Sequence, residues 1–159
     1  MMHNWFTCKI RYEKTMENGM NKKVTEPYLV DALSFTEAES RIIEEMTPFF
    51  QGEFVVAGVA RANYEEIFPS DEECADRWYK CKLWFMTLDE KTGVEKRTAS
   101  NVLVQASDLR DAIKKLDEGM KDTLADYVIA SVAETAIMDV YPYEADPDVK
   151  PEFNDADRR

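Results

Sequence analysis

Aromatic and cationic side chains alternate along two stretches of the chain, residues 5–14 and 78–86. Each stretch reads as a strand, in which successive side chains point to opposite faces. Rings that alternate with cations on a sheet are suited to single-stranded nucleic acid, because bases stack on the rings while lysine and arginine contact phosphates. The candidate nucleic-acid-binding residues are Trp5, Lys9, Arg11, Trp78, Lys80, Lys82 and Trp84. Arg61 and Arg97 would extend this surface.

The same residues admit a structural interpretation. The tryptophans would then cover a second core layer or a dimer interface, and the lysine stems would lie along apolar surface with their charged ends in water. The two interpretations differ in whether the rings are accessible to a ligand.

Residues suited to catalysis are few. The single histidine, His3, lies two residues before the first predicted strand, which argues against a nucleophile–histidine pair. Five glycines leave little material for a phosphate-binding loop. Asp31, Glu65, Glu66 and Asp139 are potential metal ligands, but among 32 acidic residues some lie near each other by number alone. We therefore predict a binding protein that is not an enzyme and holds no metal or cofactor.

The two aromatic stretches belong to a longer internal similarity. Trp5–Ile10 match residues 78–83 at an offset of 73, and the similarity continues to the end of each half with one residue gained and then lost. Such small shifts indicate duplication. We expect a single domain of residues 1–142, with repeat one at 4–69 and repeat two at 77–142.

Each repeat is predicted to begin with a hairpin of two strands followed by a helix. Turns at 17–19 and 89–93 contain glycine, which tolerates the positive φ angles of tight hairpins. Pro27 predicts an edge or a bulge in the second strand. Ser34 to Glu37 reads as a capping box, and each helix that follows carries an apolar stripe typical of packing against a sheet.

A third strand closes each repeat. Residues 53–63 and 127–133 are apolar on both faces, which predicts central strands covered on both sides. The fold class is therefore α+β: two tandem strand-strand-helix-strand repeats with pseudo-twofold symmetry, forming an antiparallel sheet packed by two helices.

The charge favours a second kind of function. The net charge is -12, so a nucleic-acid site would have to be a local basic patch. Residues 143–159 are acidic and contain prolines, which predicts a disordered tail. The alternative is a protein–protein interaction module, or an acidic DNA mimic that inhibits a basic protein partner. A homo-oligomer is also compatible with the sequence.

The chain lacks the pattern of a secreted or membrane protein. It has neither a long apolar run nor a charged segment before an apolar one, which predicts a cytoplasmic protein with no membrane partner. The three cysteines have no close pairs and predict reduced, buried thiols.

The run Trp5–Tyr12, followed by residues 28–39, resembles an uncharacterised domain-of-unknown-function family of gut anaerobic bacteria and their phages or mobile elements. The resemblance extends to about Pro142 and implies no activity, so it transfers no functional residue. It implies a mobile-element setting, in which accessory proteins that handle DNA are common.

Overall fold

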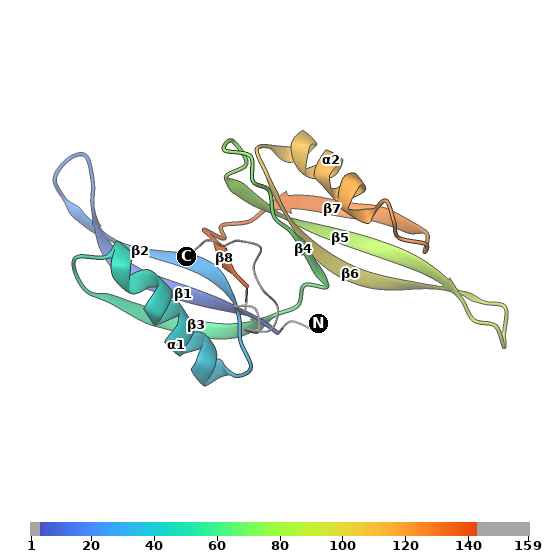
Figure 1. Ribbon diagram of the computed structural model, residues 1–159, viewed down its shortest axis with the longest axis horizontal. Helices are drawn as coiled ribbons and strands as arrows, with labels where there is room; N and C mark the ends of the chain where they lie inside the picture. Colours follow the sequence, from blue (N-terminus) through green and yellow to red (C-terminus); the bar gives the residue numbers. More distant parts are fainter. Residues whose placement is uncertain (1–3, 143–159) are drawn as a thin grey trace, which may run out of the picture.

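The computed structural model describes residues 4–142; the tail predicted at 143–159 lies outside the described residues, as do residues 1–3. The described part is an α+β structure of two four-stranded sheets, each covered on one face by a helix (Figure 1). The strands are β1 (Trp5–Thr15), β2 (Asn21–Asp31), β3 (Phe54–Ala62), β4 (Glu66–Phe68), β5 (Arg77–Leu88), β6 (Glu95–Ala106), β7 (Tyr127–Glu134) and β8 (Val140–Tyr141). The helices are α1 (Phe35–Met46), the 3-10 turn η1 (Thr47–Phe49) and α2 (Leu109–Met120).

Two long antiparallel hairpins, β1–β2 and β5–β6, form the centre of the sheets. Their turns contain Gly19 at φ 85° and Gly93 at φ 71°, which confirms the predicted positions. The Pro27 carbonyl accepts a hydrogen bond from the Met138 N–H on the side of β2 that faces away from β1. A residue's N–H and carbonyl point to the same side of a strand. The missing N–H of Pro27 therefore removes no hydrogen bond between β1 and β2.

α1 begins at the predicted cap, and both helices pack against their sheets as predicted. The Glu37 N–H donates to Ser34 Oγ over 3.1 Å, and the Asp111 N–H donates to Asp108 Oδ1 over 2.8 Å. Each helix buries three apolar side chains against its sheet: Ala38, Ile42 and Met46 in α1, and Ala112, Leu116 and Met120 in α2. The helices thus cover one face of each sheet and leave the other, the helix-free face, to neighbours or solvent.

The prediction that the third strands are central is wrong. The N-terminal sheet has the order β3-β1-β2-β8 and the C-terminal sheet the order β4-β6-β5-β7, so β3 and β7 lie at edges. Their side chains on the helix-free face are small or uncovered, and Val55 and Val128 are 53% and 56% exposed. An apolar run therefore does not require cover on both faces when one face carries mainly alanine, glycine and serine.

The prediction of one antiparallel sheet is also wrong, because the last short strand of each half crosses to the other half. β4 pairs parallel with β6, and β8 pairs parallel with β2. Ile67 lies opposite Leu103, and Val140 lies opposite Leu29. The exchange makes both sheets mixed and joins the two halves through backbone hydrogen bonds.

The acidic segment at 70–76 packs on α2. The Lys115 ammonium contacts Glu72 over 2.7 Å and Asp111 over 3.0 Å, and it donates to Ser70 Oγ over 3.0 Å. The segment between the two predicted repeats is therefore held against the C-terminal half.

A separate apolar cluster lies where the two helix-free faces meet. Trp5, Leu29, Trp78 and Leu103 are buried together there, with Ile67 and Val140 packed against them. The molecule thus has a core between each sheet and its helix and a further core between the two halves.

Candidate functional site

The predicted site residues fall into two groups that differ in exposure. Trp5 and Trp78 are only 6% and 3% exposed and belong to the core between the halves. These two rings therefore pack as the structural interpretation expects, and a base has no access to their buried faces. Lys9, Arg11 and Lys80 are exposed on the helix-free faces.

Trp84 is the one predicted aromatic that is not buried, and it lies between two cations. Lys82 Nζ is 4.7 Å from the centre of a Trp84 ring, and Arg97 Cζ is also 4.7 Å away. Lys82 precedes Trp84 by two residues on β5, and Arg97 lies diagonally across on β6. We call Lys80, Lys82, Trp84 and Arg97 the Trp84 cluster.

Small neutral neighbours surround the Trp84 cluster on the sheet. Trp84 pairs with Ala99 on one side and Val128 on the other, and Lys82 pairs with Asn101 and Ser131. Residues paired across antiparallel strands share a face, so these side chains lie beside the cluster. No ion pair joins Lys80, Lys82 or Arg97 to a carboxylate within residues 4–142. Their charges are therefore available to an anionic ligand.

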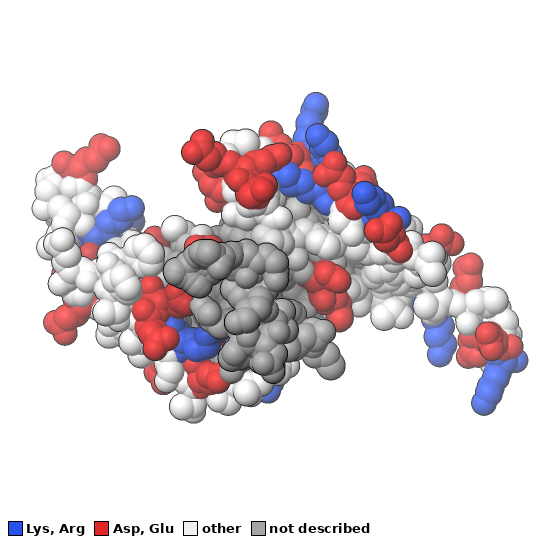
Figure 2. Space-filling model, in the orientation of Figure 1, with Lys and Arg blue, Asp and Glu red and all other residues white. Residues whose placement is uncertain are grey.

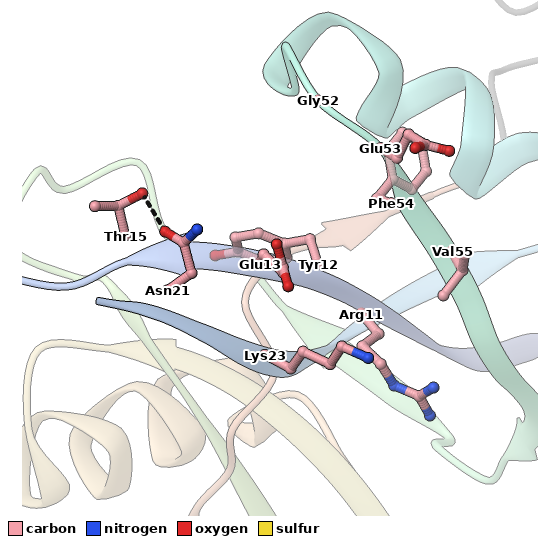
Figure 3. A pocket seen from close by; sticks show the side chains of 10 residues that line it. All are labelled: Arg11, Tyr12, Glu13, Thr15, Asn21, Lys23, Gly52, Glu53, Phe54 and Val55. Carbon is pink, nitrogen blue, oxygen red and sulfur yellow. Dashed lines mark hydrogen bonds between the residues drawn. The ribbon is translucent and has the colours of Figure 1, made fainter. Parts of the chain in front are cut away.

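The helix-free face of the N-terminal sheet carries cations without an exposed tryptophan. Arg11 pairs with Thr25 on β2 and Val55 on β3, and Lys23 lies diagonally across from Arg11. Both line a hollow of about 600 Å³. Figure 3 shows their side chains extending next to one another, with Glu13 further along the same strand. Sequence reasoning missed Lys23, although pairing the hairpin about its predicted turn would have placed it on this face.

Arg61 does not extend the predicted surface. It lies opposite Phe6 on the helix side of the N-terminal sheet, with its Cζ 5.2 Å from the Phe6 ring centre and 5.6 Å from that of Phe35. Arg97, by contrast, lies on the predicted face and contacts Trp84.

Acidic side chains are numerous on the two helices. α1 carries four glutamates and one arginine. Figure 2 shows acidic side chains near α1 and along α2, where lysines and arginines lie among them. One helix-free face carries Lys9, Arg11 and Lys23 together with Glu13, which pairs with Lys23. The other carries Lys80, Lys82 and Arg97 together with Glu95.

The carboxylates of the described residues form no metal centre, and the two buried thiols are poorly reactive. Within residues 4–142, no three His, Cys, Asp or Glu side chains come together to hold a metal ion. Burial raises the pKa of both Cys8 and Cys81 to about 11, which makes them poor nucleophiles near neutral pH. Cys74 is exposed, so the prediction of three buried thiols holds for two of them.

No helix in the described part of the chain is long and apolar enough to cross a membrane. No protein of curated function matches the sequence. Residues 4–143 match the model of a family described as Domain of unknown function (DUF4494). The resemblance to an uncharacterised family is thereby confirmed, and the chain belongs to the DUF4494 family.

Proposed function

We propose that the protein is a non-enzymatic binding protein that engages single-stranded nucleic acid through the Trp84 cluster. The observation that carries the proposal is the placement of Trp84 between Lys82 and Arg97. Neither cation forms an ion pair with a carboxylate of residues 4–142. The ring offers a stacking surface for a base, and the flanking cations offer contacts for the adjacent phosphates.

The site is smaller than the sequence suggests. Trp5 and Trp78 are assigned to the core, while Lys9, Arg11 and Lys23 form a second cationic patch on the N-terminal sheet. With a net charge of -12, the protein repels nucleic acid at long range. We therefore expect weak binding that depends strongly on salt, because each phosphate contact releases counterions.

We also propose that the chain is a tandem repeat with pseudo-twofold symmetry. Two features of the strand pairing support this. The register between β1 and β3 shifts between Lys9 and Ile10, and the register between β5 and β7 shifts at the equivalent point, 73 residues later, between Lys82 and Leu83. The reciprocal pairing of β4 and β8 obeys the same correspondence. The first strands of the two hairpins correspond at an offset of 73 residues. The second strands correspond at an offset of 74, because Lys23 pairs with Glu13 as Arg97 pairs with Met86. The extra residue of the second copy therefore lies in the turn.

The test of the binding site is a titration with a fluorescently labelled single-stranded oligonucleotide, followed by anisotropy at low and moderate salt. We expect Arg97→Ala and Trp84→Ala each to weaken binding by about tenfold, in line with about 1–3 kcal/mol per stacked base. Lys96→Ala is the matched control, because Lys96 is adjacent in sequence but pairs with Thr87 on the opposite face. Equal losses in Arg97→Ala and Lys96→Ala would show that binding reflects general charge.

A protein–protein interaction function is the second candidate, and the acidity of α1 favours it. α1 carries Glu37, Glu39, Glu44 and Glu45 against Arg41, beside the partly exposed Phe35 and Ile43. Such a surface would suit a basic protein partner, including a DNA-binding protein whose groove it would occupy as a mimic. Reversing Glu39 and Glu44 to lysine would abolish this interaction and leave oligonucleotide binding intact, whereas the Trp84 cluster variants would do the opposite.

A further inference from the structure

The outer edge of β3 has no strand beside it among residues 4–142 (Figure 1). Lys9 of β1 lies opposite Pro27 on one side and opposite Gly58 of β3 on the other. Because the Pro27 carbonyl points away from β1, the backbone groups of Lys9 point toward β3 instead. Gly58 therefore directs its own backbone groups toward β1. The next residue, Val59, directs its N–H and carbonyl to the free edge.

The free edge of β3 is open to a further strand. Alternate residues of a strand point their backbone groups to the same side, so Arg61 presents its N–H and carbonyl there as Val59 does. No other described segment hydrogen-bonds to these groups. β3 contains no proline or lysine, the residues that often protect sheet edges. Its single cation, the Arg61 side chain, lies against the rings of Phe6 and Phe35.

An open hollow of about 250 Å³ lies beside this edge, between α1 and β3. Phe35 of α1 and Val56 and Val59 of β3 supply its apolar walls. Phe35 is 48% exposed and both valines are half-buried, so these walls are accessible. The hollow is smaller than small-molecule sites, which span about 300–1,000 Å³. A strand added to β3 would direct alternate side chains to the helix side, where the hollow can take an apolar one.

The charge of the hollow indicates which peptide suits it. Glu39 is the charged member of the described residues that line it. Glu39 is exposed and forms no ion pair with another residue of 4–142. At an offset of 74 residues, α2 has Ile113 in place of Glu39 and Arg110 in place of Thr36. The equivalent edge in the C-terminal half therefore replaces this acid with an apolar residue and adds a cation.

We propose that β3 accepts an extended peptide of a partner protein as an additional strand. An apolar side chain of the peptide enters the hollow, and a lysine or arginine two residues away lies beside Glu39. A second copy of this chain suits the edge less well, because pairing β3 with β3 would bring together two α1 helices, each with four glutamates and one arginine. The inference rests on the second candidate function above and names the form that its partner takes.

The probe is the acetylated and amidated peptide Thr-Lys-Thr-Leu-Thr-Lys-Thr, which has a lysine two positions to either side of its apolar residue. Amide hydrogen exchange of the full, isotope-labelled chain is followed by NMR with and without this peptide. Without it, the amides of Val59 and Arg61 should exchange fast, while those of Gly58 and Ala60 exchange slowly. Saturating peptide should slow exchange at Val59 and Arg61 by at least about tenfold, because an added strand supplies acceptors for their N–H groups.

Glu39→Lys should weaken peptide binding by about fivefold or more, because it replaces attraction by repulsion. Glu44→Lys is the matched control, since Glu44 is an exposed acid of the same helix outside the hollow, and it should change the affinity by less than about twofold. The same peptide with glutamate in place of lysine should bind the unaltered chain more weakly.

Four results would each overturn the proposal: unchanged exchange at Val59 and Arg61, slow exchange there before peptide is added, equal binding of the glutamate peptide, or equal losses in Glu39→Lys and Glu44→Lys. Equal losses would leave the second candidate function standing, with the overall acidity of α1 as its basis in place of the β3 edge.

Discussion

The helix-free faces of the two sheets differ more than the scaffolds beneath them. In both halves the first strand pairs with its two neighbours in the same manner and shifts register at the same point. On the exposed face, Arg11 pairs with Thr25 and Val55, while Trp84 pairs with Ala99 and Val128. The buried positions thus preserve the fold, and the exposed positions give each half its own surface chemistry.

The exchanged strands show a second difference. Phe68 of β4 packs over Gly119 of α2, where an added Cβ would lie 2.8 Å from the ring. Tyr141 of β8 instead stacks on Tyr28 at 6.3 Å between ring centres. Gly119 lies inside α2, one residue before its end at Met120. Its absent side chain admits the ring from the other half.

The largest expected effect separates two tryptophans of one strand. Trp78→Ala should lower the free energy of unfolding by about 3–5 kcal/mol, because it opens a cavity in the core between the halves. Trp84→Ala should cost about 1 kcal/mol or less, since it loses mainly the contacts to Lys82 and Arg97. Urea denaturation measures both. Equal costs would contradict the assignment of Trp78 to the core and Trp84 to the surface.

The next effect tests the packing of Phe68. Gly119→Ala should destabilise the protein by roughly 1 kcal/mol, because a clash worth about 1–3 kcal/mol outweighs a gain of about 1 kcal/mol in helix propensity. Glu45→Ala is the control in α1, one residue before the final methionine, and should stay within about 0.5 kcal/mol. A stabilising Gly119→Ala would mean that the ring does not occupy this space. Adding Phe68→Leu should relieve the clash, which a double-mutant cycle would detect.

Helix capping should show equal effects in the two halves. Ser34→Ala and Asp108→Ala each remove a side-chain acceptor from the first turn, at a cost of about 0.5–1 kcal/mol. Thermal unfolding of the two variants measures this cost. A difference of more than about 1 kcal/mol would show that the helices do not contribute alike, despite their matching caps.

The smallest expected effect near neutral pH is the pH dependence of stability that comes from cysteines and tyrosines with raised pKa values. Burial raises the pKa of Cys8 and Cys81 to about 11. Burial also raises the tyrosine pKa values, with nearby acids adding to the shift; the tyrosines are Tyr12, Tyr28 and Tyr141 on the N-terminal sheet and Tyr127 on the C-terminal sheet. A raised pKa stabilises the fold while the group stays protonated. This stability is complete below the ordinary values of 9 and 10 and is lost as the pH rises toward 11 and 12.

The N-terminal sheet should therefore open first in alkali, because more of these groups lie on it. Alkylation followed by mass spectrometry measures this opening at each cysteine. At pH 8 we expect only Cys74 to react, since it is exposed. As the pH rises, Cys8 should become reactive before Cys81. Simultaneous reaction, or Cys81 first, would contradict the difference between the sheets.

The sequence predicts the hairpins, caps and helix stripes because each depends on neighbouring residues. Gly19 and Gly93 determine the turns, and Ser34 caps α1, within a few residues of the structure they form. The positions of β3 and β7 at sheet edges depend on distant partners instead. The exchange of β4 and β8 could not be predicted from the sequence either, because strands of two or three residues carry no information about which sheet they join.

The sequence predicts which face of the sheet carries the candidate site. Alternation places Trp78 and Trp84 on the same side of β5, and the structure has both there. Alternation does not reveal that the other half buries Trp78 and leaves Trp84 partly exposed. Exposure along a strand depends on how the two halves pack, which local pattern does not encode.

The exchange of strands has a consequence for the timing of folding during synthesis. The N-terminal sheet lacks β8 until residues 140–141 have been made, although β3 ends at Ala62. Adding these roughly 80 residues at about 5–20 residues per second takes about 4–16 s. During that interval the edge of β2 has no strand to cover it, and the C-terminal half is still being made. A nascent chain stalled before Val140 should therefore be open to chaperones, whereas release of the complete chain closes both sheets.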